Sequence, residues 1–145
     1  MKLTTRTRYG VRLMLDLACR HGDGPVYLKD IAGREEISEK YLSQIIIPLR
    51  RRGLVRSTRG AHGGYSLARP PGEITLWEIM EPLEGGFLVD CVEHASACHR
   101  VPTCAVRDVW TMVGEKISES LSSLTLGDLA RMSREKAENN LTQNI

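Results

Sequence analysis

The sequence has no uninterrupted run of apolar residues that approaches the roughly 20 needed to cross a bilayer. Its opening, residues 1–6, has no apolar segment of the kind found in signal peptides. We therefore expect a protein without a membrane segment that stays in the cytoplasm. In that reducing compartment, clustered cysteines more often bind metal or sense redox state than form structural disulfides.

The residue patterns of common enzymes are also missing. No Ser-His-Asp arrangement, phosphate-cradling Gly-Lys-Ser/Thr loop or paired acid cluster stands out. A chain of 145 residues can bury a sizeable core in one compact unit or in two closely joined units, which argues against the large α/β catalytic architectures. We expect a binding protein and not an enzyme.

Acidic residues are absent from two stretches that are rich in basic ones. Residues 1–15 carry four positive charges and residues 40–69 carry seven, with no Asp or Glu in either stretch. A positive field segregated in this way suits phosphate groups, and the release of their condensed counterions makes association depend strongly on salt. The pattern favours a nucleic-acid binder, and a basic face that is merely solvated is the alternative.

Apolar periodicity predicts three helices in the N-terminal half. An i, i+3, i+4, i+7 rhythm of apolar residues predicts a helix over residues 5–21, which Thr4 or Thr5 caps. Residues 28–35 form a second, short helix, and a third helix begins after Ser38. The last two helices are a helix-turn-helix candidate.

The helix after Ser38 has one apolar stripe and one polar face. Lys40, Ser43 and Gln44 lie opposite the stripe, with Arg51 beside them. That face is expected to meet a partner. Pro48 lacks a backbone N–H, so we expect a bend or an early end of the helix just before it.

Two short strands follow, over residues 54–58 and 65–68, around a glycine-rich tip at residues 59–64. Helix, helix and hairpin in this order describe a winged helix, whose second helix enters the major groove of double-stranded DNA while the hairpin follows the backbone or minor groove. Ordinary hairpins also need glycine in their turns. The glycine-rich tip indicates a DNA-binding wing because it follows an arginine-rich helix. The residues expected at the DNA interface are Lys40, Tyr41, Ser43, Gln44, Arg50, Arg51, Arg59, Gly60, His62, Gly63 and Gly64.

The C-terminal half is also predicted to be helical. Thr75 opens a capping box for a short helix that Pro82 ends. After Cys104, apolar residues recur at steps of three and four over about 19 positions, which predicts a long self-associating helix and a homodimer. Packing of this helix against the first helix is the alternative. Residues 125–129 start one more short turn of helix, after which residues 135–144 are expected to fray.

These elements make a mostly α fold with a small β-hairpin, a winged helix-turn-helix followed by a long dimerisation helix. We divide the chain into a DNA-binding domain (1–80), a linker with a cluster-binding cysteine loop (81–104), a dimerisation helix with a short helix (105–132) and a polar tail (133–145).

Three cysteines, Cys91, Cys98 and Cys104, fall within fourteen residues of polar sequence. Their spacing fits neither a Cys-x-x-Cys redox pair nor a tight zinc knuckle, and suits thiolates around a cluster larger than one ion. A three-cysteine zinc site completed by His99 and a metal-free thiol sensor are the alternatives. Cys19 stands apart and is predicted to be a small buried apolar residue. The candidates for a fourth ligand are His94, His99, Glu93 and Asp108, or a group from outside the loop.

A resemblance to a known family rests on motifs spread over the chain up to about residue 130. They are Met1-Lys2-Leu3-Thr4-Thr5 with Arg8-Tyr9-Gly10, residues 37–44, Leu49-Arg50 with Gly53-Leu54-Val55, residues 59–65, Trp110 and residues 125–129. These motifs resemble the Rrf2 family of winged-helix transcription regulators, which includes IscR, NsrR and CymR. The three cysteines make the chain more similar to the IscR-like, cluster-binding branch than to CymR-type members, which lack them and regulate cysteine metabolism.

The resemblance implies a dimeric regulator whose cysteine loop holds an iron–sulfur cluster, with 2Fe-2S favoured and 4Fe-4S possible. It implies a repressor of iron–sulfur cluster assembly genes. The alternatives are a nitric-oxide or redox-sensing repressor of the same family, a zinc or thiol-based regulator and, outside this class, a protein–protein adaptor that uses the long helix.

Three positions depart from the family pattern. Arg107 stands where IscR-type members have a ligand histidine, and arginine cannot be a ligand. Residues 5–9 contain no aspartate of the kind that NsrR-type members supply from the partner subunit. Ser43 replaces a glutamate of IscR-type recognition helices that is thought to discriminate between DNA site classes. These departures leave four candidates in or beside the loop, or a group outside it, for the fourth ligand, and they remove the glutamate that would set the preference between DNA site classes.

Overall fold

The computed structural model describes residues 2–86 and 88–144; Met1, with which the family-like opening begins, lies outside them. Its regular elements are α1 (Thr5–Cys19), α2 (Leu28–Glu35), α3 (Glu39–Arg51), β1 (Val55–Thr58), β2 (Gly64–Leu67), α4 (Leu76–Glu84), α5 (Asp90–Glu93), α6 (Ala105–Ser122) and α7 (Leu126–Gln143). Three short 3-10 turns join them: η1 (Pro71–Glu73), η2 (Ala95–Ala97) and η3 (Val101–Thr103).

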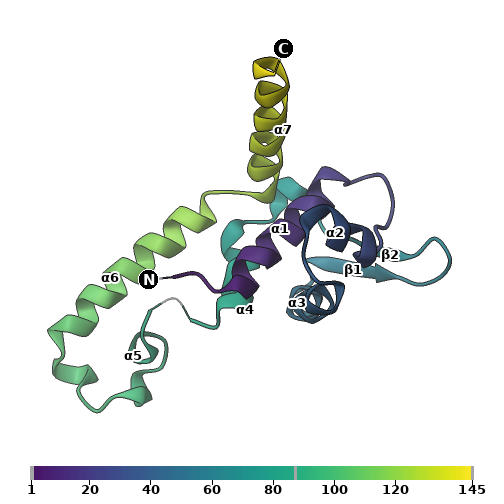
Figure 1. Ribbon diagram of the computed structural model, residues 1–145. Coiled ribbons are helices and arrows are strands. Elements are labelled where there is room, and N and C mark those ends of the chain that lie inside the picture. The colour runs from purple at the N-terminus through teal and green to yellow at the C-terminus, as the bar shows by residue number, and fades with distance from the viewer. Residues whose placement is uncertain (1, 87, 145) are drawn as a thin grey trace.

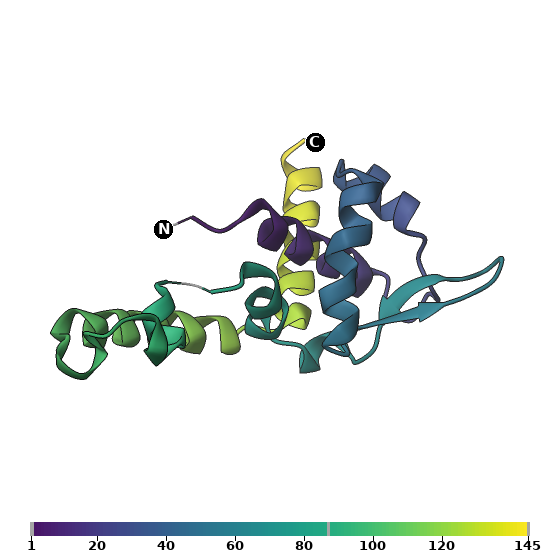
Figure 2. The ribbon, with the colours of Figure 1, turned by 90° about the horizontal axis from the view of Figure 1, so that it is seen from below.

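Helices α1 to α4 form a compact body from which three elements project (Figure 1). The β1–β2 hairpin leaves one end of the body, and α6 with the loop before it extends from the other end, as the second view also shows (Figure 2). Helix α7 begins on the body and then stands away from it. The β1–β2 hairpin and α6 thus lie at opposite ends of the molecule.

The starts of α1, α3, α4 and α7 are fixed by side-chain caps. The Thr4 side chain accepts a hydrogen bond from the Thr7 backbone N–H, and the Ser38 side chain accepts one from the Tyr41 N–H. Such caps satisfy N–H groups that have no partner within the helix. The buried side chains of these helices and the hairpin form one core, which includes Leu13, Met14, Leu17, Ile31, Leu42, Ile45, Leu49, Leu54, Ile74, Ile79 and Leu126.

Helix α1 packs closely against α4 at Gly10. A Cβ atom at this position would lie 2.2 Å from Leu83 Cδ1 and 3.4 Å from Ile45 Cγ2. Leu83 is 4% exposed, so its side chain cannot turn aside without displacing the core around it. Gly10 therefore sets the distance between α1 and α4.

Substitution of Gly10 by alanine is expected to lower the free energy of unfolding by about 1–2 kcal/mol. The steric clash of the new methyl group with Leu83 destabilises the fold by more than the higher helix propensity of alanine stabilises it. Gly33→Ala is the matched control, since no atom lies within 4 Å of a Cβ built at Gly33 in α2. That variant is expected to gain about 0.5–1 kcal/mol from propensity alone. Urea denaturation followed by circular dichroism measures both, and equal stabilisation by the two substitutions would contradict this packing.

Neither proline ends its helix, so the predicted end at Pro82 and the early end considered at Pro48 were wrong. Helix α3 continues through Pro48 to Arg51, and α4 continues through Pro82 to Glu84. Each proline lies near the end of its helix, and the buried Leu49 and Leu83 that follow hold the last turn on the core. Tertiary packing therefore outweighs the loss of one backbone hydrogen bond in each helix.

The C-terminal helix is longer than the single short turn that the sequence predicted, and residues 135–143 are helical. Thr125 and Asp128 form a capping box, and the hydrogen bonds from the Thr125 backbone N–H and hydroxyl lower the pKa of the Asp128 carboxyl. Leu126 and Ala130 anchor the first turn in the core. The Ala, Glu, Lys and Arg residues beyond favour helix, which explains its extension into solvent.

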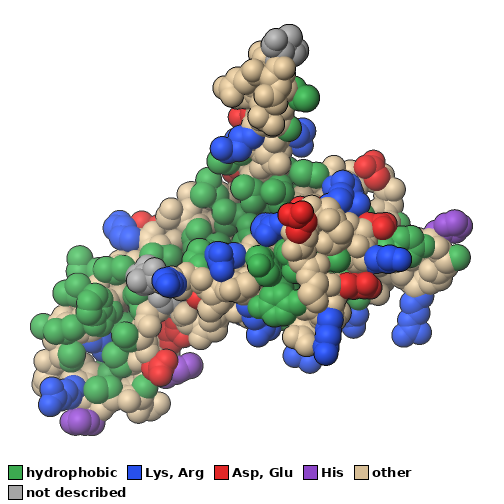
Figure 3. All heavy atoms as spheres, in the orientation of Figure 1, with side chains coloured by type: hydrophobic (Ala, Val, Ile, Leu, Met, Phe, Trp, Pro, Cys, Tyr) green, Lys and Arg blue, Asp and Glu red, His purple; other side chains and the backbone are tan. Residues whose placement is uncertain are grey.

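Helix α6 has the opposite character, because none of its residues is buried. It packs on α4 and α5, and its apolar stripe stays exposed: Val106 57%, Val109 51%, Trp110 41%, Met112 64% and Val113 36%. Figure 3 shows hydrophobic side chains gathered over the α6 arm. The alternative prediction was that this stripe packs against the first helix. In the structure α1 does not cover the stripe.

Cys19 also differs from its prediction. It is exposed, whereas the neighbouring Ala18 is buried. The reason is that Cys19 is the last residue of α1, where the helix leaves the core.

Candidate nucleic-acid interface and cysteine loop

The solvent-facing side of α3 presents one continuous polar face. Its exposed residues recur at steps of three and four, which places them along one side of the helix. The opposite side, with Leu42, Ile45, Ile46 and Leu49, is buried in the core. The face consists of Lys40, Ser43, Gln44, Ile47, Arg50 and Arg51.

Ile47 lies in the middle of this face and is 47% exposed. The sequence reasoning missed it, although its spacing from Ser43 and Gln44 was the available signal.

Two residues predicted at the interface are partly engaged within the protein. The Ser43 hydroxyl donates to the Lys40 backbone carbonyl at 2.6 Å, so its oxygen stays available only as an acceptor. The Tyr41 ring packs edge-on against the Tyr9 ring, with the centroids 5.9 Å apart. Tyr41 is half-buried and lies at the border of the polar face.

The basic residues of the 40–69 stretch divide into two groups. Arg52 pairs with Glu81 at 2.6 Å, and Arg69 pairs with Glu78 at 2.7 Å. The other members are exposed and have no ion pair within residues 2–86 and 88–144. They are Lys40, Arg50, Arg51, Arg56 and Arg59.

Electrostatics agree with this division. Partial burial raises the pKa of the Glu78 carboxyl, but hydrogen bonds from the Thr75 backbone N–H and from Arg69 outweigh burial and hold that pKa below its ordinary value. Glu78 is thus a carboxylate that engages Arg69 at neutral pH. In Figure 3, blue Lys and Arg side chains project below α3 and the hairpin.

The wing, meaning β1, β2 and the tip at residues 59–63, is held by close backbone packing. The strands pair antiparallel from Val55 opposite Leu67 to Thr58 opposite Gly64. Gly64 has φ +135°, and a Cβ there would lie 2.4 Å from the Val26 carbonyl oxygen. Glycine is required at this position because the segment before α2 lies directly against the hairpin.

Gly60 and Gly63 shape the tip itself. Gly60 has φ +110°, and a Cβ on Gly63 would lie 2.2 Å from the Thr58 carbonyl oxygen. Arg59, Gly60 and His62 are exposed, whereas Gly63 is buried and Gly64 half-buried. The structure therefore brings the exposed tip residues to the end of a projecting hairpin, and the last two glycines serve its packing.

The cysteine loop, residues 88–104, lies at the outer end of α6. Cys91 is in α5, Cys98 follows η2 and Cys104 is the N-cap of α6. All three are half-buried free thiols. The Arg107 Nε donates to the Cys91 backbone carbonyl at 2.7 Å, which ties the loop to the first turn of α6.

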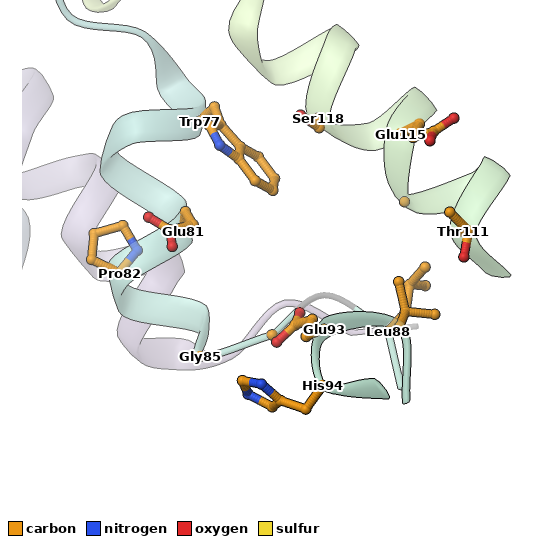
Figure 4. A pocket seen from close by; sticks show the side chains of 13 residues that line it. Trp77, Glu81, Pro82, Gly85, Leu88, Glu93, His94, Thr111, Glu115 and Ser118 are labelled. Atoms are coloured by element: carbon orange, nitrogen blue, oxygen red, sulfur yellow. The ribbon is translucent and has the colours of Figure 1, made fainter. Parts of the chain in front are cut away.

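A cavity of about 680 Å³ separates this loop from the body. Trp77 of α4 points into it, with Leu88, Glu93 and His94 from the loop across from Thr111 of α6 (Figure 4). Two candidates for a fourth ligand thus line this cavity, and none of the three cysteines is among its described lining residues. The other two candidates, His99 and Asp108, are exposed.

Comparison with known proteins decides the family. A family model described as Rrf2, iron-dependent transcriptional regulator, matches residues 3–132. The chain belongs to the Rrf2 family. It is therefore a DNA-binding transcription regulator of the helix-turn-helix type and not an enzyme. This identity replaces the alternative of a protein–protein adaptor.

Individual relatives match over most of their length. Protein rrf2 of Nitratidesulfovibrio vulgaris is 42% identical over 132 residues, which are 90% of this chain and 88% of that protein. The structure of T. potens IscR has a TM-score of 0.77 and 42% identity, covering 94% of this chain and 90% of that one. CymR, the global cysteine regulator of B. subtilis, has a TM-score of 0.74 and 41% identity, with 91% and 98% covered.

These structures confirm the mostly α winged-helix fold with its hairpin. Their names also span two branches of the Rrf2 family, one represented by IscR and the other by a cysteine regulator. Among the helices of the Rrf2 chain that the structure describes, none has the length and apolar character of a membrane span.

The cysteine loop of the Rrf2 chain fits an iron–sulfur cluster in the kind of donors that it offers. Three unpaired thiols on one loop supply the soft ligands that such clusters use. Among the described residues, however, no three His, Cys, Asp or Glu side chains are placed to share a metal ion.

Proposed function

We propose that this Rrf2 protein is a cytoplasmic, homodimeric repressor of iron–sulfur cluster assembly genes that depends on a cluster held by Cys91, Cys98 and Cys104. The observation that carries the proposal is the set of three free thiols on one loop, tied to α6 by the hydrogen bond from Arg107 to the Cys91 carbonyl. In this scheme residues 1–80 bind DNA, 81–104 hold the cluster, and 105–132 form the dimer. Residues 133–145 form a polar C-terminal segment.

The α3 face supports insertion into the major groove of double-stranded DNA. Gln44 and Ser43 are placed for base edges, Tyr41 for the border of the groove, and Ile47 for a thymine methyl group. The unpaired basic residues Lys40, Arg50, Arg51 and Arg59 suit phosphates, together with the exposed tip residues Gly60 and His62. Gly63 and Gly64 would contribute by allowing the close packing that shapes the wing. Phosphate contacts fix the register in which α3 reads the bases.

The exposed stripe of α6 supports dimerisation with a second copy of the chain. It borders a groove of about 630 Å³ whose lining is almost entirely apolar and includes Leu3, Met80, Val113 and Ile117. A contiguous apolar surface of this kind marks a protein interface, and a second α6 offers the matching stripe. Two winged helices would then meet two half-sites of an operator.

The cysteine loop lies where it can influence how the two winged helices of a dimer are spaced. It contacts α6 through Arg107 and faces α4 across the cavity lined by Trp77 and Glu93. A bound cluster would supply chemistry that responds to oxygen, nitric oxide or iron supply. Reordering of the loop between α4 and α6 then changes the spacing of the two wings and hence the affinity for the operator.

Anaerobic isolation of the protein tests the proposal. We expect iron and acid-labile sulfide bound to the thiols, visible absorbance that is lost in air, and different affinities of the loaded and stripped forms for a duplex selected from a random pool. Stoichiometric zinc without iron, sulfide or colour would overturn the cluster. Failure of both forms to select any duplex would overturn the role at DNA.

A second candidate is a metal-free thiol regulator. Two observations favour it. The described residues of the loop place no three possible ligands around one metal ion, and Arg107 occupies the position where IscR-type members have a ligand histidine. It predicts a colourless protein whose affinity for DNA changes on oxidation and recovers with a thiol reductant. The absorbance of the anaerobic protein separates it from the cluster proposal.

Arg59→Ala is expected to weaken binding to all DNA sequences and to reduce the slope of log K against log salt by about one. The reason is that Arg59 is an exposed, unpaired cation on the wing. Arg134→Ala, which removes an exposed cation from α7, is the matched control and is expected to leave the slope unchanged. Fluorescence anisotropy over a salt series measures both, and an unchanged affinity of the Arg59 variant would remove the wing from the interface.

A further inference from the structure

Tyr27 occupies the N-cap position of α2, where it makes no side-chain hydrogen bond to the helix. Short polar residues are preferred at this position because their side chains satisfy free backbone N–H groups. The Tyr27 hydroxyl instead donates to the Ala61 backbone carbonyl at the wing tip, 34 residues along the chain. The Tyr27 side chain thus serves the wing and not its own helix.

The preceding residue, Val26, bonds the same hairpin at Tyr65, one residue from the last ladder pair. The Val26 N–H donates to the Tyr65 carbonyl and the Tyr65 N–H donates to the Val26 carbonyl, both at 2.8 Å. Gly64 permits this approach, since a Cβ there would lie 2.4 Å from the Val26 carbonyl oxygen. Two consecutive residues therefore attach the wing to the start of α2, Val26 at the outer end of the strands and Tyr27 at the tip.

The tip has little structure of its own to fix its position. Beyond the last ladder pair, Thr58 with Gly64, the backbone bond within the tip among the described residues runs from the Gly63 N–H to the Gly60 carbonyl at 3.0 Å. Figure 2 shows the hairpin extending beyond the helices of the body. A glycine-rich tip in solvent samples many conformations unless something outside the hairpin restrains it.

We infer that Tyr27 is a positioning residue for DNA binding, which holds the wing tip through Ala61 and so places Arg59 and His62 relative to α3. This inference rests on the proposed role at DNA and does not depend on the cluster. The contact orders the tip before DNA arrives, so less conformational entropy is lost on binding. Tyr27 itself need not touch DNA for this effect.

Tyr27→Phe removes the hydroxyl and keeps the ring. Its affinity for a duplex selected from a random pool by the wild-type protein is expected to fall about three- to tenfold, the net worth of one hydrogen bond. Hydrogen exchange at the tip amides is expected to become faster without DNA. Tyr65→Phe is the matched control, because its hydroxyl on the same hairpin has no hydrogen bond among the described residues; its affinity should stay within about twofold.

Tyr27→Ser separates positioning from stability. Serine is a preferred N-cap, so the melting temperature is expected to stay or rise while the affinity for DNA falls as in the phenylalanine variant. A residue with a merely structural role would lower both quantities. In the Arg59→Ala background, Tyr27→Phe is expected to have a smaller effect, since the two residues act through one tip.

Three results would overturn the inference. They are Tyr27→Phe binding as tightly as the wild type, unchanged exchange at the tip amides, and full additivity with Arg59→Ala. A wild-type protein that selects no duplex would overturn the proposed role at DNA and this inference with it. Selection by the wild type, with equal affinity of the phenylalanine variant, would overturn the inference alone.

Discussion

A Trp110→Glu variant is expected to be a monomer and to bind its selected duplex about 100-fold more weakly than the wild type, or worse. Trp110 is 41% exposed in the middle of the α6 stripe, between Val106 and Val113. A carboxylate at this position would have to be buried without a partner in the dimer, which is strongly unfavourable. Loss of the dimer also removes the advantage of binding two half-sites at once.

Analytical ultracentrifugation and fluorescence anisotropy measure the two effects. Ser122→Glu is the matched control, because it adds the same charge to α6 at an exposed position away from the stripe. It is expected to remain dimeric and to bind DNA normally. A Trp110→Glu protein that stays dimeric with an intact helical spectrum would show that the α6 stripe is not the interface.

Loss of any one loop cysteine is expected to lower bound iron by about tenfold or more in protein isolated without oxygen. Cys91→Ser, Cys98→Ser and Cys104→Ser each replace a soft thiolate with a hydroxyl that ligates iron poorly. The affinity of these variants for DNA should no longer differ between anaerobic and air-exposed samples. Iron and sulfide analysis, visible absorbance and anisotropy measure these changes.

Two further variants sharpen this test. Cys19→Ser removes an exposed thiol that lies on α1, outside the loop, and is expected to leave the iron content unchanged. Arg107→His places an imidazole where IscR-type members have a ligand, and is expected to slow the loss of colour in air. Equal iron in the three loop variants and the wild type would place the metal elsewhere in the molecule.

Local features of the fold could be predicted from the sequence. The short helix over residues 28–35 was predicted with the bounds that the structure has. The caps at Ser38 and Thr75 were confirmed, as was Thr4 as one of two candidates for the first helix. These features depend on residues within one or two turns of each other, so their pattern is visible in the sequence.

The lengths of several helices could not be predicted in the same way. Pro48 and Pro82 were expected to bend or end their helices, but the buried Leu49 and Leu83 hold the following turn. The first turn of α7 is fixed by the Leu126 N–H, which donates to the Ile74 carbonyl at 2.7 Å. The energy that decides these helix ends comes from contacts made far along the chain.

The division of the arginines is another tertiary result. The sequence shows seven basic residues without an acid over residues 40–69, but it does not show that Glu81 and Glu78 return to engage Arg52 and Arg69. The site residues predicted on α3 do share one face, with Ile47 added and Tyr41 at its border. The three cysteines share a loop, but the described structure does not gather them around a common point.

By itself, the sequence determined the order of helices and hairpin, the segregation of charge and the family. Periodicity, caps and motifs depend on residues that are close together in the sequence, so they can be recognised without the structure. Only the tertiary structure decided which basic side chains remain unpaired, that the α6 stripe stays uncovered, and that Tyr27 reaches the wing tip. Each of these outcomes depends on which distant segments come within contact distance, and that is fixed by packing of the whole chain.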